Sequence, residues 1–322
     1  MTSLNQKTAE PILIIGAEAG VGTVELNRPS AINALSVEML QQLTEALTDF
    51  SQDPELQEVE LRGAGQRGLC AGADVRQLRE LVMTGGDVRG FFETEYRLNL
   101  LIASYPKPYR ALMTGITMGG GLGISIHGSQ RVVDATSRLA MPETQIGLFP
   151  DVFVSWLLAR LPGEVGTHLA LTGASINAAD ALRLGLADEG TGPLPDPDPG
   201  LAGGWIAECY TGNAPAEILG RLSEHADPHA RAAAEEIARR SPLSVAISLE
   251  ALRRAAGFAD RAAQYDQELA LAVRLTTGPD FVEGVRAQLV DRDRQPRWAH
   301  SSLAEVTRGE VESFFEPLPS VG

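Results

Sequence analysis

The sequence predicts an α/β fold followed by a helical C-terminal region. Short runs of β-branched and apolar residues alternate with helical patterns up to about residue 190, which is typical of a sheet with parallel strands. Residues 190–200 (GTGPLPDPDPG) are rich in Pro, Gly and Asp and predict a linker. From residue 201 onward almost every pattern is helical. We therefore expect an α/β core at 1–195 and a helical region at 196–322.

The first elements can be placed in order. Residues 11–15 (PILII) and 22–26 (GTVEL) predict two strands around a turn. Ser36 is a good N-cap for a helix over 37–50, whose apolar residues fall on one face. We expect a strand at 59–62, a glycine-containing loop at 63–74, a helix over 75–82, a second over 85–104 and a strand at 109–114.

The stretch from 115 to 151 carries the strongest chemical signal. The cluster Gly119, Gly120, Gly121 and Gly123 precedes a run of near-helical spacing, and β-like runs follow at 131–134 and 138–140. This stretch closes with two carboxylates beside prolines, Glu143 and Asp151.

Later segments predict helices, at 152–160, in two parts of 161–188, and at 214–224, 229–240, 242–257, 259–276 and 279–290.

Composition limits the partners. The net charge is −15, which disfavours nucleic acid and anionic membranes. No apolar run reaches about 18 residues, so no membrane span is expected. Residues 1–10 are polar and lack the apolar core of a signal peptide, and 316–322 is expected to be a mobile tail. With two cysteines and no disulfide or metal motif, we expect a reducing, cytoplasmic location.

The two glycine loops suggest an oxyanion site. A glycine turn that opens a helix presents free backbone N–H groups, which suit a negatively charged oxygen. Two carboxylates downstream make acyl transfer a candidate reaction. The alternative is structural: glycines that permit close packing, and carboxylates that cap helices or lie in solvent.

Other residues are weaker candidates. Cys70 lacks an evident histidine partner, and His127 is better explained by packing or capping than by catalysis. The first glycine loop lacks the lysine of a phosphate-binding P-loop. Arg28 is a weak candidate for a ligand pocket, and surface solvation is the default for Arg292, Arg294 and Arg297.

Three segments resemble the crotonase (enoyl-CoA hydratase/isomerase) superfamily: LNRPSAINAL at 26–35, GLCAGADV at 68–75 and ITMGGGLG at 116–123. Within it, four longer segments resemble the 3-hydroxyisobutyryl-CoA hydrolase subgroup: 91–99, 115–128, 140–152 and 280–298. The resemblance covers about residues 12 to 315. It implies stacked ββα units with a helical C-terminal region, a homo-oligomer that is a trimer or larger, and an acyl-CoA substrate without a separate cofactor or metal.

The resemblance also assigns residues. It implies that the amides of Ala71 and Gly120 bind the thioester oxygen, and that Gly72 and Asp74 lie in the substrate site. Glu143 and Asp151 match the catalytic pair of the hydrolases, and Glu95 matches a substrate-contacting glutamate. Hydratases typically carry a second glutamate at the position of Gly123, which has no acid–base group.

These assignments predict hydrolysis of a 3-hydroxyacyl-CoA, with 3-hydroxyisobutyryl-CoA of valine catabolism as first substrate. The alternatives are an enoyl-CoA hydratase or isomerase, and a non-catalytic acyl-CoA-binding protein. One departure concerns the acyl pocket. After residues 149–152 the hydrolases usually have glycines and an aromatic residue, whereas this chain has Phe153, Val154, Ser155 and Trp156.

Overall fold

A six-stranded sheet forms one side of the molecule in the computed structural model, which describes residues 10–319. The strand order is β1-β2-β3-β4-β6-β8; β1 and β2 are antiparallel and the other neighbours are parallel. A second sheet pairs β5 with β7 in parallel. The strands are β1 (Leu13–Glu18), β2 (Val21–Leu26), β3 (Glu58–Gly63), β4 (Tyr109–Leu112), β5 (Ile116–Met118), β6 (Gln130–Asp134), β7 (Arg138–Ala140) and β8 (Glu189–Thr191).

The helices before residue 195 are α1 (Val37–Gln52), α2 (Val75–Thr84), α3 (Val88–Ala103), α4 (Gly120–Gly123), α5 (Val154–Leu158), α6 (Val165–Thr172) and α7 (Ala178–Arg183). Of these, α1, α4 and α7 pack against strands, and α5 and α6 pack against other helices. Ser36 caps α1 as expected, because its side chain accepts from the Met39 N–H. The glycine cluster opens a helix, but α4 is a single turn.

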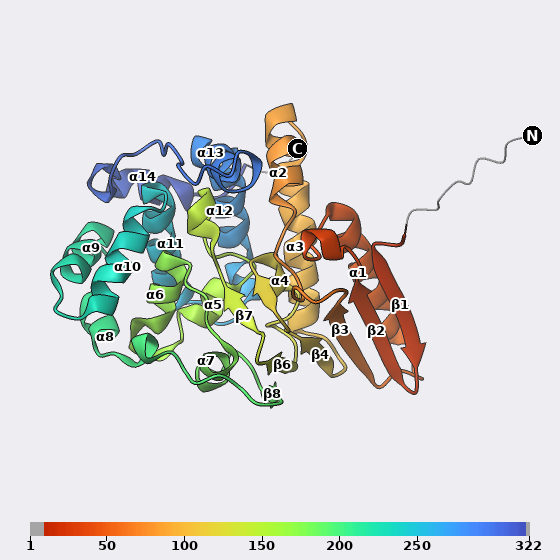
Figure 1. The fold of residues 1–322 in the computed structure, drawn as a ribbon. Coiled ribbons are helices and arrows are strands. Elements are labelled where there is room, and N and C mark those ends of the chain that lie inside the picture. Colours follow the sequence, from red (N-terminus) through yellow and green to blue (C-terminus); the bar gives the residue numbers. More distant parts are fainter. Residues whose placement is uncertain (1–9, 320–322) are drawn as a thin grey trace, which may run out of the picture.

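Beyond residue 200 the described chain contains only helices, turns and irregular segments. The helices are α8 (Trp205–Cys209), α9 (Pro215–Glu224), α10 (Pro228–Ala238), α11 (Pro242–Ala255), α12 (Tyr265–Thr277), α13 (Pro279–Val285) and α14 (Arg308–Phe314), with a π-helical turn at Arg286–Val290. In Figure 1, α2 and α3 stand between the sheet and the C-terminal helices. Contacts of α12 with α3 and of α13 with α2 join these layers.

The predicted α/β fold is confirmed, with differences in detail. The segment expected to start the linker contains β8, which extends the large sheet beside β6. The expected strand at 109–114 ends at Leu112, and β5 follows after a turn at Gly115. The division at residue 195 stays a prediction. Residues 1–9 and 320–322 lie outside the described residues, so most of the expectation for 1–10 is left open. Of the expected mobile tail, 316–319 is described, and its backbone accepts hydrogen bonds from Arg274 and Arg89.

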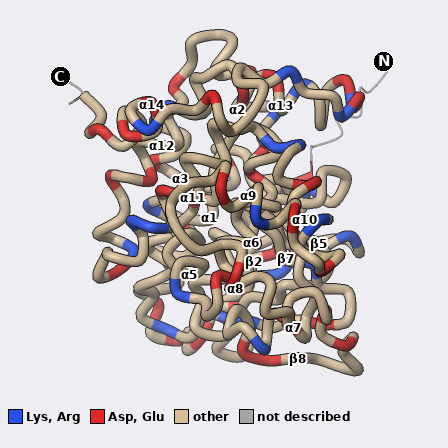
Figure 2. The backbone as a smooth tube through the Cα atoms, turned by 90° about the vertical axis from the view of Figure 1, so that its left-hand side faces the viewer, with Lys and Arg blue, Asp and Glu red and all other residues tan. Residues whose placement is uncertain are grey.

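Charges of both signs are spread over the surface, although the net charge is −15. Figure 2 shows basic and acidic residues interspersed along the backbone from α7 to α13. In the part of the chain that the structure describes, no helix combines the length and apolar character needed to cross a bilayer. Nor do three His, Cys, Asp or Glu side chains within residues 10–319 gather as metal ligands.

Candidate active site

A cavity of about 260 Å³ opens where the two glycine loops meet. Its walls come from residues 71–73, from Gly119 and Gly120, from α2 and α3, and from Gln288 and Leu289 of the π-helical turn. Three of the predicted carboxylates, Glu95, Glu143 and Asp151, line it together. Segments separated by more than 200 residues therefore build one pocket.

The first glycine loop offers a different amide from the one expected. The Ala71 N–H already donates to the Ile32 carbonyl at 2.9 Å, so it is not free to bind a ligand. Within residues 10–319 the Ala73 N–H has no acceptor, and Ala73 also lines the cavity. The structure therefore contradicts a free amide at Ala71, and Ala73, two residues further along, is the cavity-lining residue of this loop whose amide is unpaired in the described chain.

The Gly120 amide lies next to that of Ala73. A β-carbon added at Gly120 would be 3.1 Å from Ala73 N and 2.4 Å from Glu95 Oε1. One added at Gly119, where φ is +51°, would be 2.7 Å from Glu143 Oε1. Among the described residues the Gly120 N–H has no acceptor either. Two free amides thus face the cavity, and glycine is required for the carboxylates to approach the backbone.

Gly72 and Asp74 have different positions. Gly72 lines the cavity in a conformation with φ of +106°, which favours glycine. Asp74 does not line the cavity; it caps α2 by accepting from the Gln77 N–H and pairs with Arg28 at 3.0 Å. Its contacts in the structure are therefore those of a helix cap.

Glu143 begins the 3₁₀ turn η2 (Glu143–Ile146), directly after β7 and Met141–Pro142. The residue is 7% exposed, and its Oε2 has no hydrogen-bond partner among the described residues. Burial, and then the nearby charge of Asp151, raise the pKa of Glu143 well above its usual range. A carboxyl held in this way is a stronger base than a free glutamate once it ionises.

Asp151 is fixed by Tyr96 of α3. The residue is 4% exposed, and its Oδ2 accepts from the Tyr96 hydroxyl at 2.8 Å. Burial raises the pKa of Asp151 to about 7, and the Tyr96 hydrogen bond opposes this shift. Asp151 therefore changes charge near neutral pH.

Glu95 also reaches the cavity from α3. It is 1% exposed, and its Oε1 lacks a partner within the described chain. Burial raises the pKa of Glu95 well above its usual range, and the charges of Asp151 and Glu268 add to this. An unpaired oxygen on a cavity wall is suited to a ligand hydroxyl.

Sequence reasoning missed Glu268 of α12. It is fully buried, and its carboxylate accepts from the Ser155 hydroxyl at 2.6 Å and the Phe153 N–H at 3.1 Å. Burial, and then Asp151, raise its pKa to about 8. The available signal was a charge between apolar residues of a helix, which indicates burial but not its partner.

Gly123 has no room for the glutamate that a hydratase would carry. A β-carbon there would lie 2.8 Å from Val152 Cβ and 2.9 Å from Asn99 Nδ2. Asn99 is fully buried, and neither of its polar side-chain atoms has a partner in residues 10–319. The space is therefore filled by side chains from α3 and from the segment after Asp151.

The weaker candidates lie outside the cavity lining. Burial raises the pKa of Cys70 to about 12, which keeps it a thiol at neutral pH. Burial lowers the pKa of His127 to about 3, and its Nε2 lies 2.7 Å from the Val152 carbonyl oxygen. Arg292, Arg294 and Arg297 are exposed, as the default predicted.

The chain is similar to a known family and to known proteins over most of its length. The family model described as "Enoyl-CoA hydratase/isomerase" matches residues 21–192 and 195–315. The chain is 35% identical to the mitochondrial 3-hydroxyisobutyryl-CoA hydrolase of Gallus gallus, over 95% of this chain and 89% of the relative. Identity to the Homo sapiens protein of the same name is 34%, over 99% and 92%.

Solved structures add a second set of relatives. A carnitinyl-CoA dehydratase from Mycobacterium thermoresistibile is 41% identical with a TM-score of 0.91, and 95% of this chain and 97% of that chain are covered. An enoyl-CoA hydratase from Rhodobacter sphaeroides is 37% identical with a TM-score of 0.90, over 96% and 98%. The expected fold is confirmed by these similarities.

The expected cytoplasmic location is wrong against these comparisons, because the curated hydrolases are named as mitochondrial. Cysteine usage could not have revealed this, because it reports redox environment and not compartment. The match of the family model over most of the sequence, with full-length relatives above 30% identity, places the chain in the enoyl-CoA hydratase/isomerase (crotonase) family.

Proposed function

We propose that this protein hydrolyses 3-hydroxyacyl-CoA thioesters, with 3-hydroxyisobutyryl-CoA as the first substrate to test. Membership of the family supports an acyl-CoA-processing enzyme. One observation carries the proposal beyond this: two free amides and the pair Glu143 and Asp151 face the same cavity. These are the groups needed to polarise a carbonyl and to attack it.

The amides of Ala73 and Gly120 bind the thioester oxygen in this proposal. As the carbonyl carbon is attacked, negative charge develops on that oxygen, and preorganised N–H donors stabilise it. Loss of one such donor typically costs about 3 kcal/mol of barrier. Because both donors are backbone groups, only changes that move the backbone or fill the space remove them.

Glu143 supplies the attack by one of two routes. As a nucleophile it forms a mixed anhydride and releases the CoA thiolate, and water then cleaves the anhydride. As a general base it takes a proton from water, which attacks directly. In both routes the products are a carboxylic acid and CoA, and the ionised form of Glu143 reacts. Because the charge of Asp151 helps to raise the pKa of Glu143, Asp151 takes up the proton that Glu143 gives up before the attack.

Asp151 manages a proton beside Glu143. With a pKa of about 7, it holds or releases that proton near neutral pH. The protonated form can donate to the departing thiolate, and the Tyr96 hydroxyl fixes its orientation. Glu95 accepts a hydrogen bond from the substrate 3-hydroxyl through its unpaired Oε1.

Hydration or dehydration is the second candidate reaction, because the two solved relatives bear those names. The filled space at Gly123 counts against it, since no second carboxylate faces the cavity from that position. A non-catalytic acyl-CoA-binding protein is disfavoured by three buried carboxylates on the cavity wall, because buried charge without a counter-ion is costly.

The deciding experiment incubates the purified protein with 3-hydroxyisobutyryl-CoA, isobutyryl-CoA and crotonyl-CoA. Free thiol and enoyl absorbance are followed in parallel, with Glu143→Gln as the matched control. Hydrolysis of 3-hydroxyisobutyryl-CoA or isobutyryl-CoA releases thiol without producing enoyl absorbance, and any absorbance that crotonyl-CoA loses by hydrolysis is matched by released thiol. An absorbance change without thiol would replace the proposal by hydration or dehydration, and neither change would leave a binding protein.

The proposed assembly is a homo-oligomer, a trimer or larger, as the resemblance implies. Light scattering on the eluted peak from size-exclusion chromatography gives the mass directly, and a mass near 34.3 kDa would contradict it.

A further inference from the structure

The peptide unit between Val152 and Phe153 directly follows Asp151 and has an unusual conformation. Both residues have positive φ, +48° and +59°, although one is β-branched and the other aromatic. L-residues of these types rarely adopt this region, and each such position costs about 1–3 kcal/mol. The surrounding structure must therefore hold this segment in place.

Hydrogen bonds hold the peptide unit at both ends. The Val152 carbonyl accepts from His127 Nε2 at 2.7 Å, and the Phe153 N–H donates to Glu268 Oε2 at 3.1 Å. Because a carbonyl oxygen only accepts, Nε2 of His127 carries the hydrogen. The buried His127 and Glu268 thus hydrogen-bond to opposite edges of the same peptide unit, one to its carbonyl and the other to its N–H.

The two holders come from distant parts of the chain and are themselves fixed. Glu268 lies on α12 and uses its other oxygen to accept from the Ser155 hydroxyl and the Gln264 amide. His127 follows α4, and its ring packs edge-on against that of Phe153 with centroids 6.4 Å apart. Burial keeps His127 uncharged at neutral pH, since its pKa is lowered to about 3.

This peptide unit lies inside the backbone turn that Asp151 opens. The Asp151 carbonyl accepts from the Val154 N–H, so the backbone closes a turn over the gripped unit. On the other side, the Asp151 carboxylate meets only the Tyr96 hydroxyl among the described side chains. A rotation of the peptide unit would therefore change the turn in which the Asp151 backbone takes part.

We propose that His127 and Glu268 are positioning residues, which hold the Val152–Phe153 peptide unit and thereby the Asp151 carboxylate in its reactive orientation. This inference rests on the proposed function for its kinetic test, but its structural part does not. The alternative is that both residues only satisfy buried hydrogen bonds and stabilise the fold.

The kinetic test uses Glu268→Leu and His127→Phe, which keep volume and remove the hydrogen bonds. We expect kcat for thioester hydrolysis to fall at least tenfold, with KM within threefold of wild type, because the acyl-CoA contacts are untouched. Glu268→Gln keeps an oxygen for the Phe153 N–H and should retain at least a third of kcat.

Asp180→Leu is the matched control. Asp180 is as deeply buried as Glu268 and also accepts a backbone N–H, that of Asp198, but it does not line the cavity. Its kcat per folded molecule should stay within twofold of wild type. A loss of kcat below threefold in Glu268→Leu, or an equal loss in Asp180→Leu, would overturn the inference. If Glu268→Leu fails to fold, His127→Phe and Ser155→Ala carry the same comparison.

Amide hydrogen exchange separates this inference from the proposed function. Exchange of residues 152–155 should rise at least tenfold in Glu268→Leu and His127→Phe, but not in Asp180→Leu. Unchanged exchange of residues 152–155 in Glu268→Leu and His127→Phe would show that the two residues do not hold the peptide unit, even if the enzyme is active. Increased exchange in Glu268→Leu and His127→Phe, combined with a wild-type protein that releases no thiol, would refute only the proposed function.

Discussion

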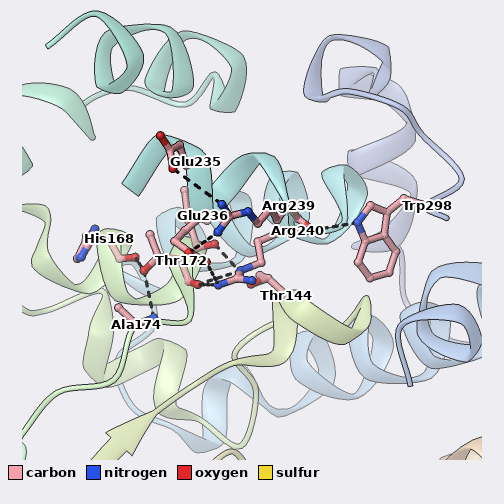
Figure 3. A network of polar contacts seen from close by, with 10 residues as sticks. Thr144, His168, Thr172, Ala174, Glu235, Glu236, Arg239, Arg240 and Trp298 are labelled. Carbon is pink, nitrogen blue, oxygen red and sulfur yellow. Dashed lines mark hydrogen bonds and ion pairs between the residues drawn. The ribbon is translucent and has the colours of Figure 1, made fainter. Parts of the chain in front are cut away.

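Glu143 and Thr144 are neighbours in η2, yet they face surroundings that differ in charge. Glu143 faces a cavity whose wall carries Glu95 and Asp151 and no cation. Thr144 faces the end of α10, where its carbonyl accepts from the Ser241 N–H at 3.3 Å. There Arg240 pairs with Glu236 at 2.8 Å and donates to the Thr172 carbonyl, as Figure 3 shows.

This difference in surroundings shows how η2 can hold Glu143, a buried carboxyl that lowers the stability of the fold. In the cavity, burial without a counter-charge raises the pKa of each carboxyl, which makes it reactive and costs stability. On the α10 side of the turn, Arg239 pairs with Glu235 and Glu236, and Arg240 pairs with Glu236. The Trp298 indole donates to the Arg239 carbonyl (Figure 3). Paired charges and backbone hydrogen bonds there hold the geometry that the cavity requires.

The largest effect should come from Glu143→Gln. We expect kcat to fall by about 10²–10⁴-fold, the usual contribution of an acid–base group, while the free energy of unfolding stays equal or rises. Thiol-release kinetics and denaturant unfolding measure the two quantities. Turnover like that of wild type would show that Glu143 takes no part in the reaction. It would also mean that the two sides of η2 do not differ in reactivity.

Gly123→Glu tests whether the cavity side tolerates another carboxylate. The β-carbon alone would contact Val152 and Asn99 below 3 Å, so we expect destabilisation by about 4 kcal/mol from overpacking and buried charge. Crotonyl-CoA hydration should not appear. Gly220→Glu on α9 is the control, because a β-carbon there meets nothing within 4 Å. A stable Gly123→Glu protein with efficient hydratase activity would contradict both the packing and the reaction assignment.

Asp151→Asn should stabilise the protein at alkaline pH. The folded-state pKa of about 7 lies above the ordinary 3.8, so the folded state keeps a proton that the unfolded chain has lost. Wild-type stability therefore falls as pH rises from about 4 to 7. At 1.36 kcal/mol per unit, Asn should gain on the order of 4 kcal/mol at pH 8 and nothing below pH 4.

The opposite sign is expected for Glu283→Gln. A hydrogen bond from Arg286 lowers the pKa of Glu283, so its stabilisation is present at neutral pH and is lost in acid. Urea titrations of both variants between pH 3 and 8 give the two curves. Parallel pH dependence in the two variants would mean that pairing does not distinguish these carboxylates.

Glu95 should determine hydroxyl specificity. If its free oxygen accepts from the 3-hydroxyl, wild type should prefer 3-hydroxyisobutyryl-CoA over isobutyryl-CoA by about 1–3 kcal/mol, or about 5–150-fold in kcat/KM. The preference should shrink in Glu95→Gln and more in Glu95→Ala. The same ratio in all three proteins would move hydroxyl recognition to another group, with Asp151 the next to test.

The smallest effect on stability and kcat is expected on the α10 side of η2, away from the cavity. Glu236→Gln removes the partner of Arg239 and Arg240, but Arg240 keeps its hydrogen bonds to the Thr172 carbonyl. We expect a loss below about 1 kcal/mol, smaller in high salt, and unchanged kcat. A large loss of kcat here would show that the two sides of η2 are coupled.

Local chemistry allowed much of the fold to be predicted. Ser36 caps α1 through its own side chain, and the apolar face of α1 has helical spacing, so neighbouring residues determine both. The edge strand β8 was missed for the opposite reason. Its residues are exposed and its Gly-rich sequence resembles a loop, so only pairing with β6 makes it a strand.

The residues of the candidate site likewise divide into those predictable from local sequence and those that depend on tertiary contacts. Glycine loops and nearby carboxylates could be recognised along the chain, and the family resemblance supplied Glu95. The choice between Ala71 and Ala73 depends on which amide the Ile32 carbonyl occupies, and this is a tertiary contact. Glu268 lies 113 residues from Ser155, so no sequence pattern connects it to the segment after Asp151.

The wall formed by Leu289 has a consequence for biosynthesis. Arg76 of α2 donates to the Leu289 carbonyl, and these partners are 213 residues apart. At about 5–20 residues per second, a ribosome needs roughly 10–40 s to make the chain between them. Once residue 151 has been made, the emerging chain has both glycine loops and the cavity carboxylates, but until residue 268 it has neither Glu268 nor the Leu289 wall. The face of α2 that α13 covers stays uncovered over that time, and the cavity is complete only when α13 and the π-helical turn dock.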